Sequence, residues 1–276
     1  MKAVRYAARD GEARIGRLDG DTITDAAPAG PGGFVPSAEA WAALADASGD
    51  QLAVDDVRLL PPVVPRKILA IGLNYRSHAE ESELDIPAVP VVFAKFPSSL
   101  IGHGEDIVIP LEETRPDFEG ELAVVIGRPT YRADRASARD AIGGITAIHD
   151  VSGRRAQLET PLRQFTLGKS FDTFSPLGPS IAQLDGVDLA DVTVRTTVSG
   201  EVMQNASTAD LIFSVVDLVV YLSSGTTLEP GDVIATGTPG GVGDSRKPPR
   251  YLREGDVVEV EVGGVGSLRN GVRGET

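Results

Sequence analysis

Short apolar runs separated by turn residues dominate the chain, which is typical of strands. Residues 1–27 contain three such runs and predict a small β-meander with a hairpin turn at Asp19-Gly20. Further on, apolar residues recur at helical spacing over 38–48, directly after Ser37. Because serine is a preferred N-cap, this pattern predicts one capped helix behind the meander.

The next segment carries three prolines within a few residues, Pro61, Pro62 and Pro65. Proline removes a backbone donor and cannot lie inside a helix, so this segment is typical of a boundary. We therefore expect a small N-terminal α/β domain over 1–65 and a larger domain over 66–276.

The larger domain is predicted to be mostly β. Apolar runs predict strands at 67–72, 91–96, 106–110, 119–127, 142–150, 192–200, 232–237 and 257–262. A hairpin is expected through Gly263-Gly264, and one long helix over 208–224, with Thr208 as its cap and Gly225 as its stop. Since strands do not alternate with long helices, a mixed β-sandwich or roll is favoured over a doubly wound parallel sheet.

The charge of the chain bears on its partners. The 276 residues include 26 Lys+Arg and 40 Asp+Glu, a formal charge of −14. Nucleic-acid binding needs a basic face, so a nucleic-acid partner is not expected. A small anionic substrate would have to be attracted by local cations or a metal ion rather than by the overall field.

Two absences narrow the chemistry. No apolar run reaches the ~18–20 residues that span a bilayer, and the first residues lack a signal-peptide core, so we expect a cytoplasmic protein without a membrane partner. The chain has no cysteine and three histidines, which excludes disulfides, thiolate nucleophiles and cysteine-based zinc sites. Catalysis would therefore depend on carboxylates, amines and imidazoles.

Three acidic residues stand at the ends of predicted strands. Glu119 and Glu121 are two residues apart and point to the same face of a strand, while Asp150 ends a second apolar strand over 144–149. Three carboxylates without thiols select a hard cation, Mg²⁺ or Mn²⁺, with Ca²⁺ less suited to catalysis. The alternatives are a solvated strand edge and a turn residue.

Two further motifs carry groups that can move protons or stabilise charge. In a helix, His78 and Glu81 would be i, i+3 neighbours, which suits an oriented general base, although a surface helix start capped by Asn74 would give the same pattern. Lys169, between Gly and Ser in an apolar stretch, could stabilise an oxyanion or could simply be a surface lysine. The glycine-rich segment 236–244 could be a surface turn.

In this order, these motifs resemble the fumarylacetoacetate hydrolase superfamily, from about Lys67 to the end, and the opening segment resembles a short N-terminal domain of bacterial members. The supporting strings are IGLNYRSHAEE, FAKFPSSLIGHGEDIVIP, DFEGELAVVIG, HDVSGR, LGKSFDTFSPLGP and VIATGTPGGVG. The resemblance implies a mixed β-sandwich roll, usually a homodimer. It also implies Mg²⁺ or Mn²⁺ (Ca²⁺ being possible in crystals) held by Glu119, Glu121 and Asp150.

The resemblance also assigns roles to further residues. It places a catalytic His–Glu dyad on His78 and Glu81, in a segment that is a mobile lid in relatives, and the active-site lysine on Lys169. The Thr-Gly-Thr-Pro turn, which lies near the bound carboxylate in relatives, falls on 236–239 and includes Thr238. Contacts to the substrate carboxylate are expected from two residues of one short segment, and these are Arg154 and Gln157.

One departure from the family pattern follows the third acidic residue. Relatives usually read Ala-Arg-Asp there, whereas this chain has Gly153 and Arg155 on either side of Arg154. Reversing a charge near the metal could shift substrate preference.

The resemblance implies an enzyme of aromatic catabolism that acts on small 2-oxo or 1,3-dioxo carboxylates. Hydrolytic C–C cleavage of an acylpyruvate-type substrate is favoured. Isomerisation of a 2-hydroxyhepta-2,4-diene-1,7-dioate type and decarboxylation of an oxaloacetate type stay open because they pass through a similar enolate. A non-catalytic protein that binds a metal or ligand is the alternative of another class.

Overall fold

Strands make up most of the regular structure in the computed structural model, which describes residues 1–8, 11–159 and 161–276. The strands are β1 Lys2–Ala7, β2 Ala13–Asp19, β3 Thr22–Pro28, β4 Gln51–Ala53, β5 Arg58–Leu60, β6 Ile68–Gly72, β7 Val91–Lys95, β8 Leu100–Ile101, β9 Ile107–Ile109, β10 Pro116–Asp117, β11 Gly120–Ile126, β12 Ile142–His149, β13 Ser152–Gly153, β14 Ser175–Ala182, β15 Thr193–Val198, β16 Glu201–Ser207, β17 Val233–Ala235, β18 Val257–Val262 and β19 Gly266–Gly274.

Helices are short by comparison. They are α1 Ala38–Ala45, α2 Arg76–Glu81, α3 Arg135–Ala141, α4 Arg154–Leu158, α5 Phe165–Gly168 and α6 Val215–Ser223, with single 3₁₀ turns at Val54–Asp56, Pro97–Ser99 and Thr208–Asp210. Among the residues that the structure describes, no helix has the length and apolar character needed to cross a membrane.

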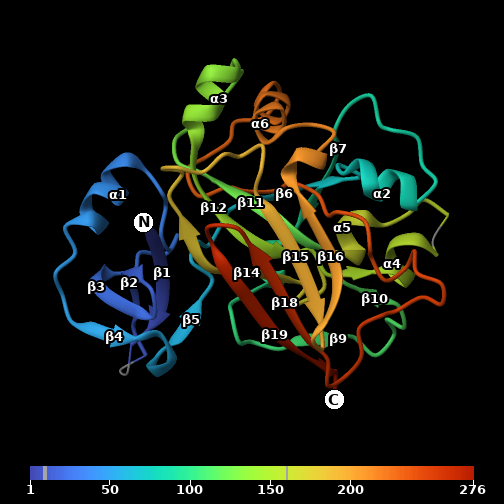
Figure 1. Cartoon of the computed structure of the whole chain (residues 1–276), viewed down its shortest axis with the longest axis horizontal. Coiled ribbons are helices and arrows are strands. Elements are labelled where there is room, and N and C mark those ends of the chain that lie inside the picture. The colour runs from blue at the N-terminus through green and yellow to red at the C-terminus, as the bar shows by residue number, and fades with distance from the viewer. Residues whose placement is uncertain (9–10, 160) are drawn as a thin grey trace.

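Two large sheets organise the molecule. The longer sheet runs β4-β3-β2-β1-β14-β12-β11-β17-β6-β7, and β16-β15-β18-β19-β9 form the second. In Figure 1 the second sheet lies in front of β11 and β12. Apolar side chains of β11 and β18 meet between the sheets, including Leu122, Val124, Val258 and Val260. The chain therefore folds as a mostly β, mixed β-sandwich roll, as predicted from the sequence.

The N-terminal strands extend the longer sheet. Strand β1 pairs with β2 and β5 and also with β14, where Lys2 lies opposite Ala182. Helix α1 covers this end of the sheet, and the Trp41 indole Nε1–H donates to the Gly143 carbonyl over 2.8 Å. Ala3 and Trp41 share one apolar core with Ala123 and Val125 of β11. The opening segment therefore shares an apolar core with β11, the strand that carries the acidic motif.

Most expected elements are confirmed. All eight predicted strands of the larger region are present, and β18 and β19 form the hairpin expected at Gly263-Gly264. The meander is present, with its tight turn one residue later than expected, because Asp19 pairs with Thr22 across Gly20 and Asp21. The Ser37 hydroxyl accepts from the Ala40 amide and caps α1.

The long helix predicted over 208–224 is wrong in its first half. Helix α6 begins only at Val215, and its cap is Ser214, whose hydroxyl accepts from the Asp217 amide. The Thr208 hydroxyl instead donates to the Leu189 carbonyl over 2.9 Å. The Asn74 side chain holds Phe213 in an extended segment through its amide and carbonyl, so the chain cannot stay helical there.

Besides five strands of only two or three residues, two longer strands, β14 and β16, were not predicted from the sequence. The longer-sheet strand β14 lies between β1 and β12 and contains Pro176 and Pro179, which usually exclude an inner strand. Strand β16 is an edge strand whose residues are mostly polar. In both, pairing partners far away in the sequence define the strand, and the local pattern does not.

Candidate active site

Two neighbouring strands bring the three predicted acidic residues together. Glu119 immediately precedes β11, Glu121 is its second residue, and Asp150 directly follows β12. Strands β11 and β12 pair with Glu121 opposite Ile148, so both strand ends meet at one edge. One ligand atom from each carboxylate lies within 4.8 Å of the other two, and all three side chains are buried.

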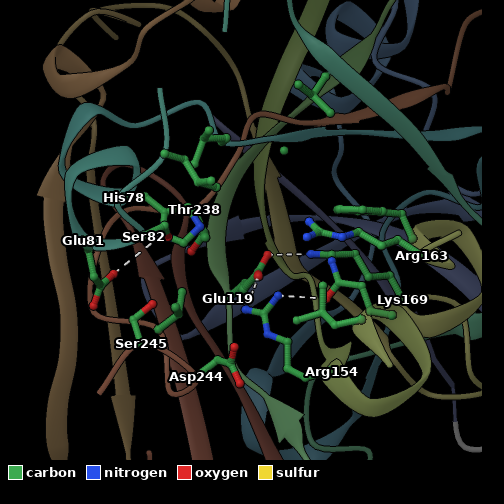
Figure 2. A pocket seen from close by; sticks show the side chains of 18 of the residues that line it. His78, Glu81, Ser82, Glu119, Arg154, Arg163, Lys169, Thr238, Asp244 and Ser245 are labelled. Atoms are coloured by element: carbon green, nitrogen blue, oxygen red, sulfur yellow. Dashed lines mark hydrogen bonds and ion pairs between the residues drawn. The ribbon is translucent and has the colours of Figure 1, made fainter. Parts of the chain in front are cut away.

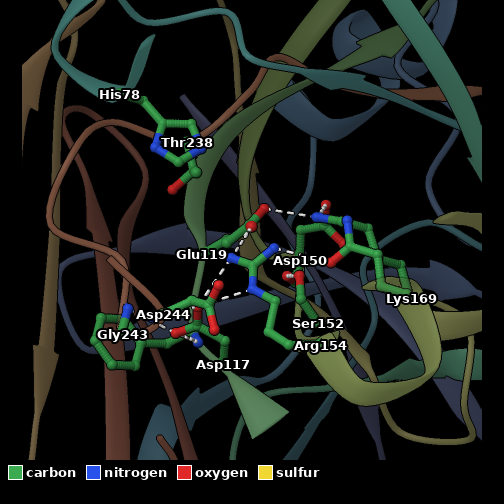
Figure 3. A network of polar contacts seen from close by, with 12 residues as sticks. His78, Asp117, Glu119, Asp150, Ser152, Arg154, Lys169, Thr238, Gly243 and Asp244 are labelled. Carbon is green, nitrogen blue, oxygen red and sulfur yellow. Dashed lines mark hydrogen bonds and ion pairs between the residues drawn. The ribbon is translucent and has the colours of Figure 1, made fainter. Parts of the chain in front are cut away.

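Buried cations surround this acidic cluster on two sides. The Lys169 ammonium donates to Glu119 Oε2 and to Asp150 Oδ2, both over 2.7 Å. Lys95, at the end of β7, donates to Asp150 Oδ1 over 2.5 Å and also to the Lys169 carbonyl. Figure 3 shows Lys169 reaching toward Glu119 and Asp150. Sequence reasoning missed Lys95, although it is the lysine of the quoted string FAKF.

The third carboxylate has a different environment. Glu121 Oε2 accepts from the Gly237 amide over 2.8 Å, and no lysine or arginine of the described residues forms an ion pair with it. Burial and repulsion from Asp150 and Glu119 raise the pKa of Glu121 well above its usual value. Burial also acts on Glu119, but Lys169 and Arg154 outweigh it and lower the pKa of that carboxyl.

These observations fit a divalent cation. All the donor atoms are carboxylate oxygens, which Mg²⁺ and Mn²⁺ prefer over the softer transition metals. The excess negative charge lies on Glu121, where a bound cation would relieve the repulsion that raises its pKa. Glu119, Glu121 and Asp150 could therefore hold one ion between them.

Arg154 is predicted to bind substrate, but in the structure most of its N–H donors contact protein groups. Its Nε and Nη2 contact Asp117 Oδ2 at 2.9 and 2.8 Å, and Nη2 also donates to Glu119 Oε1 over 2.6 Å. Its Nη1 donates to the Gln157 side-chain oxygen over 2.9 Å. A guanidinium has five N–H donors, so little of Arg154 is left for a ligand.

Asp117 was not singled out from the sequence, yet it connects three parts of the site. Besides Arg154, its carboxylate accepts from the amides of Gly243 and Asp244, at 2.7 and 3.0 Å. Complete burial raises the pKa of Asp117. The sequence does contain a signal for Asp117. It lies two residues before Glu119 and so continues the alternation of side chains that relates Glu119 to Glu121.

His78 and Glu81 lie on one helix, as predicted. Both are in α2, with His78 Nδ1 3.6 Å from Glu81 Oε2, which is an electrostatic contact longer than a hydrogen bond. The same oxygen accepts from the Gly241 amide over 2.8 Å. Burial alone would raise the pKa of Glu81, but His78 and Gly241 lower it. Asn74 is not the helix cap, since its side chain binds the Thr236 carbonyl and Phe213.

Thr238 lies in a tight turn at the wall of the site. Its hydroxyl donates to the Gly120 carbonyl over 3.1 Å and accepts from the Gln204 side-chain amide over 2.7 Å. The preceding residue, Gly237, has φ of +102°, and a Cβ there would lie 2.7 Å from the Asn74 Cβ. Packing against Asn74 thus requires glycine at position 237, and the Thr238 hydroxyl ties the turn to β11.

Seven of the nine predicted residues line one pocket of about 620 Å³, whereas Glu121 and Asp150 are not among its lining residues. Figure 2 shows His78 and Glu81 on one side of it and Lys169 and Arg163 on the other. Its charged and polar lining residues are His78, Glu81, Ser82, Glu83, Glu119, Arg154, Gln157, Arg163, Lys169, Thr238, Asp244, Ser245 and Lys247. A volume of this size is typical of small-molecule sites, which span about 300–1,000 Å³.

The structure also locates the two residues that depart from the family pattern. The Arg155 side chain is half exposed and contacts the Glu112 carbonyl and Glu159, so it does not face the acidic cluster. At Gly153 a Cβ would lie 2.6 Å from Glu113 Oε2 and 3.0 Å from the Phe171 ring. The buried Glu113 carboxylate accepts from the Arg155 and Ala156 amides at the start of α4, which leaves no room beside it.

Comparison with family models identifies the class of protein. Residues 67–273 match the model of the fumarylacetoacetate hydrolase C-terminal domain, and residues 1–62 match the model described as Rv2993c-like, N-terminal. The chain therefore belongs to the fumarylacetoacetate hydrolase family.

Particular relatives and solved structures are similar over most of the chain. The oxaloacetate tautomerase YisK of Bacillus subtilis is 41% identical over 249 residues, 86% of this chain and 82% of YisK. The human mitochondrial oxaloacetate tautomerase FAHD2A is 41% identical over 219 residues, 79% of this chain and 70% of its own. A 5-carboxymethyl-2-hydroxymuconate delta-isomerase structure from Mycobacterium smegmatis is 35% identical, with a TM-score of 0.83 and full coverage of both chains.

The two glutamates should affect stability in opposite directions in protein stripped of metal by a chelator. At neutral pH Glu121→Gln should stabilise the fold, because the raised pKa makes the ionised form of Glu121 unfavourable above the unfolded pKa. Glu119→Gln should destabilise by about 3 kcal/mol, because its lowered pKa stabilises the fold above the unfolded pKa. Urea unfolding at pH 7 measures both.

Lowering the pH provides the control for this pair. The stabilising contribution of Glu119 is lost as the pH falls through its folded pKa, and the cost of Glu121 disappears near its unfolded pKa, so the two variants should converge at acid pH. Equal destabilisation by both substitutions at pH 7 would contradict the assigned charge distribution.

Gly153→Ala should destabilise by about 1–3 kcal/mol, because the added Cβ displaces the Glu113 carboxylate from the start of α4. Gly225→Ala is the matched control, since a Cβ there meets nothing within 4 Å. The double variant Gly153→Ala/Glu113→Ala should cost less than the sum of its single variants in thermal unfolding. Strict additivity would show that the two positions do not interact.

Proposed function

We propose that this protein is an enzyme that interconverts the keto and enol forms of a small 2-oxo dicarboxylate of the oxaloacetate type. The observation that carries the proposal is one pocket onto which His78, Glu119, Lys169 and Arg154 all open. Several relatives with about 40% identity are named oxaloacetate tautomerases, which supports the choice of reaction and substrate.

Glu119, Glu121 and Asp150 would hold Mg²⁺ or Mn²⁺, because their oxygens converge and their excess charge is uncompensated. When bound, such an ion supplies Lewis-acid polarisation of the substrate's 2-oxo group. The protein residues then have to orient the substrate, move a proton and keep the carboxylates ionised.

His78 would move the proton at C3 of the substrate. Its ring lines the pocket, and Glu81, held by the Gly241 amide, lies 3.6 Å from its Nδ1 and would orient it. When His78 takes the C3 proton, the C–H electron pair forms the C2–C3 double bond and the carbonyl pair moves to oxygen. Protonation of that oxygen from solvent completes the enol, and the reverse order restores the ketone.

Lys169 would stabilise the negative charge that develops on oxygen during this step. Burial alone would lower its pKa, but Asp150 and Glu119 outweigh burial and raise it, so the ammonium stays charged. We further propose that Thr238, Gln157 and the remaining donor of Arg154 contact the carboxylate next to the 2-oxo group. Most of Arg154 would act by fixing Glu119 and Asp117.

Hydrolytic C–C cleavage of an acylpyruvate is the second candidate. It would use the same dyad, with His78 activating a water instead of removing a C3 proton.

Isomerisation is supported by the names of neighbouring structures, including a 2-hydroxyhepta-2,4-diene-1,7-dioate isomerase from Mycobacterium marinum, 34% identical with a TM-score of 0.82. The three reactions share an enolate and differ in how it forms and in what becomes of it.

His78→Ala should reduce oxaloacetate tautomerisation by about 10²–10⁴-fold, as expected for a lost general base, without changing Mg²⁺ or Mn²⁺ affinity. Ultraviolet absorbance of the enol measures the rate, and calorimetry measures metal binding. Glu81→Gln should reduce the rate less, because it removes the charge that supports His78 and leaves the imidazole in place.

The same protein should be tested on an acylpyruvate and on a dienoic dicarboxylate with each metal. Faster cleavage of the acylpyruvate than tautomerisation of oxaloacetate would replace the first candidate with the second. No turnover of any of these substrates with either metal would favour a protein that binds ligands without catalysis.

We also propose that the protein works as a homodimer in the cytoplasm, as the family resemblance implies. Exposed apolar side chains gather between Leu84 and Phe96, a segment that contains β7 at one edge of the longer sheet. An uncovered edge strand of this kind can pair with a second chain. Light scattering at micromolar concentration should give twice the mass of the chain, and a monomer there would contradict the proposal.

A further inference from the structure

Two cations at the mouth of the pocket are available to a ligand. Arg163 and Lys247 both line the pocket, and both are exposed. Within the described part of the chain, neither side chain makes a hydrogen bond or an ion pair. Figure 2 shows the Arg163 side chain extending into the pocket on the same side as Lys169. These two exposed cations therefore differ from Lys169 and Arg154, the buried cations of the same pocket.

The inner cations are neutralised by the protein itself. Lys169 is bound to Glu119 and Asp150, and Arg154 to Asp117 and Glu119. They can contact a ligand only while they keep these ion pairs. Any selection between substrates of different charge must then come largely from groups that are not already paired.

The acids of the pocket do not cancel the two outer cations. Asp244 is bound by Arg115 and by the Tyr251 hydroxyl, both at 2.6 Å, and Glu81 is held by Gly241 and His78. Among the lining acids, Glu83 has no ion pair within the described residues and is exposed, in the segment after α2. Two unpaired cations against one unpaired acid leave the mouth positive in a chain of charge −14.

The same pocket also has an apolar wall. Its residues include Leu84, Val91, Phe93, Leu158 and Phe165. The backbone next to Arg163 is held beside the pocket, because Gln164 donates its backbone amide to the carbonyl of the lining residue Gln157 over 2.9 Å. A ligand that spans this wall would need an anionic group at each end and a carbon chain between them.

We propose that Arg163, assisted by Lys247, binds the distal carboxylate of a 2-oxo dicarboxylate and so selects dicarboxylates over monocarboxylates. This inference rests on the proposed function for the position of the 2-oxo end. Arginine suits the task because its planar fork of donors matches a carboxylate in a bidentate pair. An uncharged substrate terminus would offer the Arg163 guanidinium no such pair.

Binding of two matched probes tests the proposal without turnover. With Mg²⁺ present, calorimetry should show that wild-type protein binds 2-oxoglutarate more tightly than 2-oxovalerate, which has the same chain with a methyl end. Arg163→Gln should weaken 2-oxoglutarate about 10- to 100-fold, the effect of one charged hydrogen bond, and leave 2-oxovalerate unchanged. Lys247→Gln should weaken it less, and Arg163→Lys should restore part of the loss.

Two control variants distinguish this role from a general charge effect and from a contact with Glu83. Arg195→Gln makes the same charge change on an exposed arginine of β15, paired with Glu261, and should leave both affinities unchanged. Glu83→Gln tests whether Arg163 instead pairs with the acid of the segment after α2. If Glu83→Gln reproduces the loss caused by Arg163→Gln, the two residues act as a lid contact and the proposal is overturned.

The remaining outcomes distinguish this inference from the proposed function. A wild-type protein that binds both probes equally, or neither, overturns the inference, as does an Arg163→Gln variant that keeps the wild-type preference. If that variant also tautomerises oxaloacetate with an unchanged KM, the proposed function stands and the inference fails. If Arg163→Gln loses the preference although no 2-oxo acid is turned over, the inference stands and the proposed function fails.

Discussion

The site depends on one electrostatic constraint, the burial of three carboxylates within 4.8 Å of one another. An isolated buried charge is expensive, so such a cluster persists only with cations and donors placed against it. Lys95, Arg154 and Lys169 supply this charge from three separate segments of the chain. Their arrangement leaves Glu121 uncompensated, and that asymmetry is what makes the cluster suited to a metal ion rather than a closed ion-pair network.

The same constraint explains why the glycine-rich segment is ordered. Asp117 holds the Gly243 and Asp244 amides on one side and Arg154 on the other, so the segment and the acidic cluster share one carboxylate. A Cβ at Gly243 would lie 1.9 Å from the Arg250 carbonyl. The interpretation of this segment as a mere surface turn is therefore wrong: its glycines allow the backbone to approach the buried acid that supports the site.

The sequence correctly predicted the features that depend on residues close together in the chain. Strand alternation placed Glu119 and Glu121 on one face, with Ala123 and Val125 continuing it into the core, and i, i+3 spacing placed His78 beside Glu81. Long-range contacts decided the rest. Strand β14 forms despite two prolines because β1 and β12 flank it, and Asn74 prevents the predicted helix from extending toward Thr208. Lys95 had no local signal, since only the tertiary fold brings the end of β7 to Asp150.

Paired and unpaired cations in one pocket have different uses. The buried lysine and arginine must stay bound to their carboxylates, because releasing them would leave buried charges uncompensated. They can therefore stabilise negative charge that forms during a reaction, because their electrostatic field is already oriented before the reaction starts. An exposed cation such as Arg163 has the opposite properties, since solvent weakens its field but it can exchange water for a ligand at little cost. A pocket with both kinds would separate catalysis at its base from recognition at its mouth, and differences between relatives in substrate choice should then follow mouth residues.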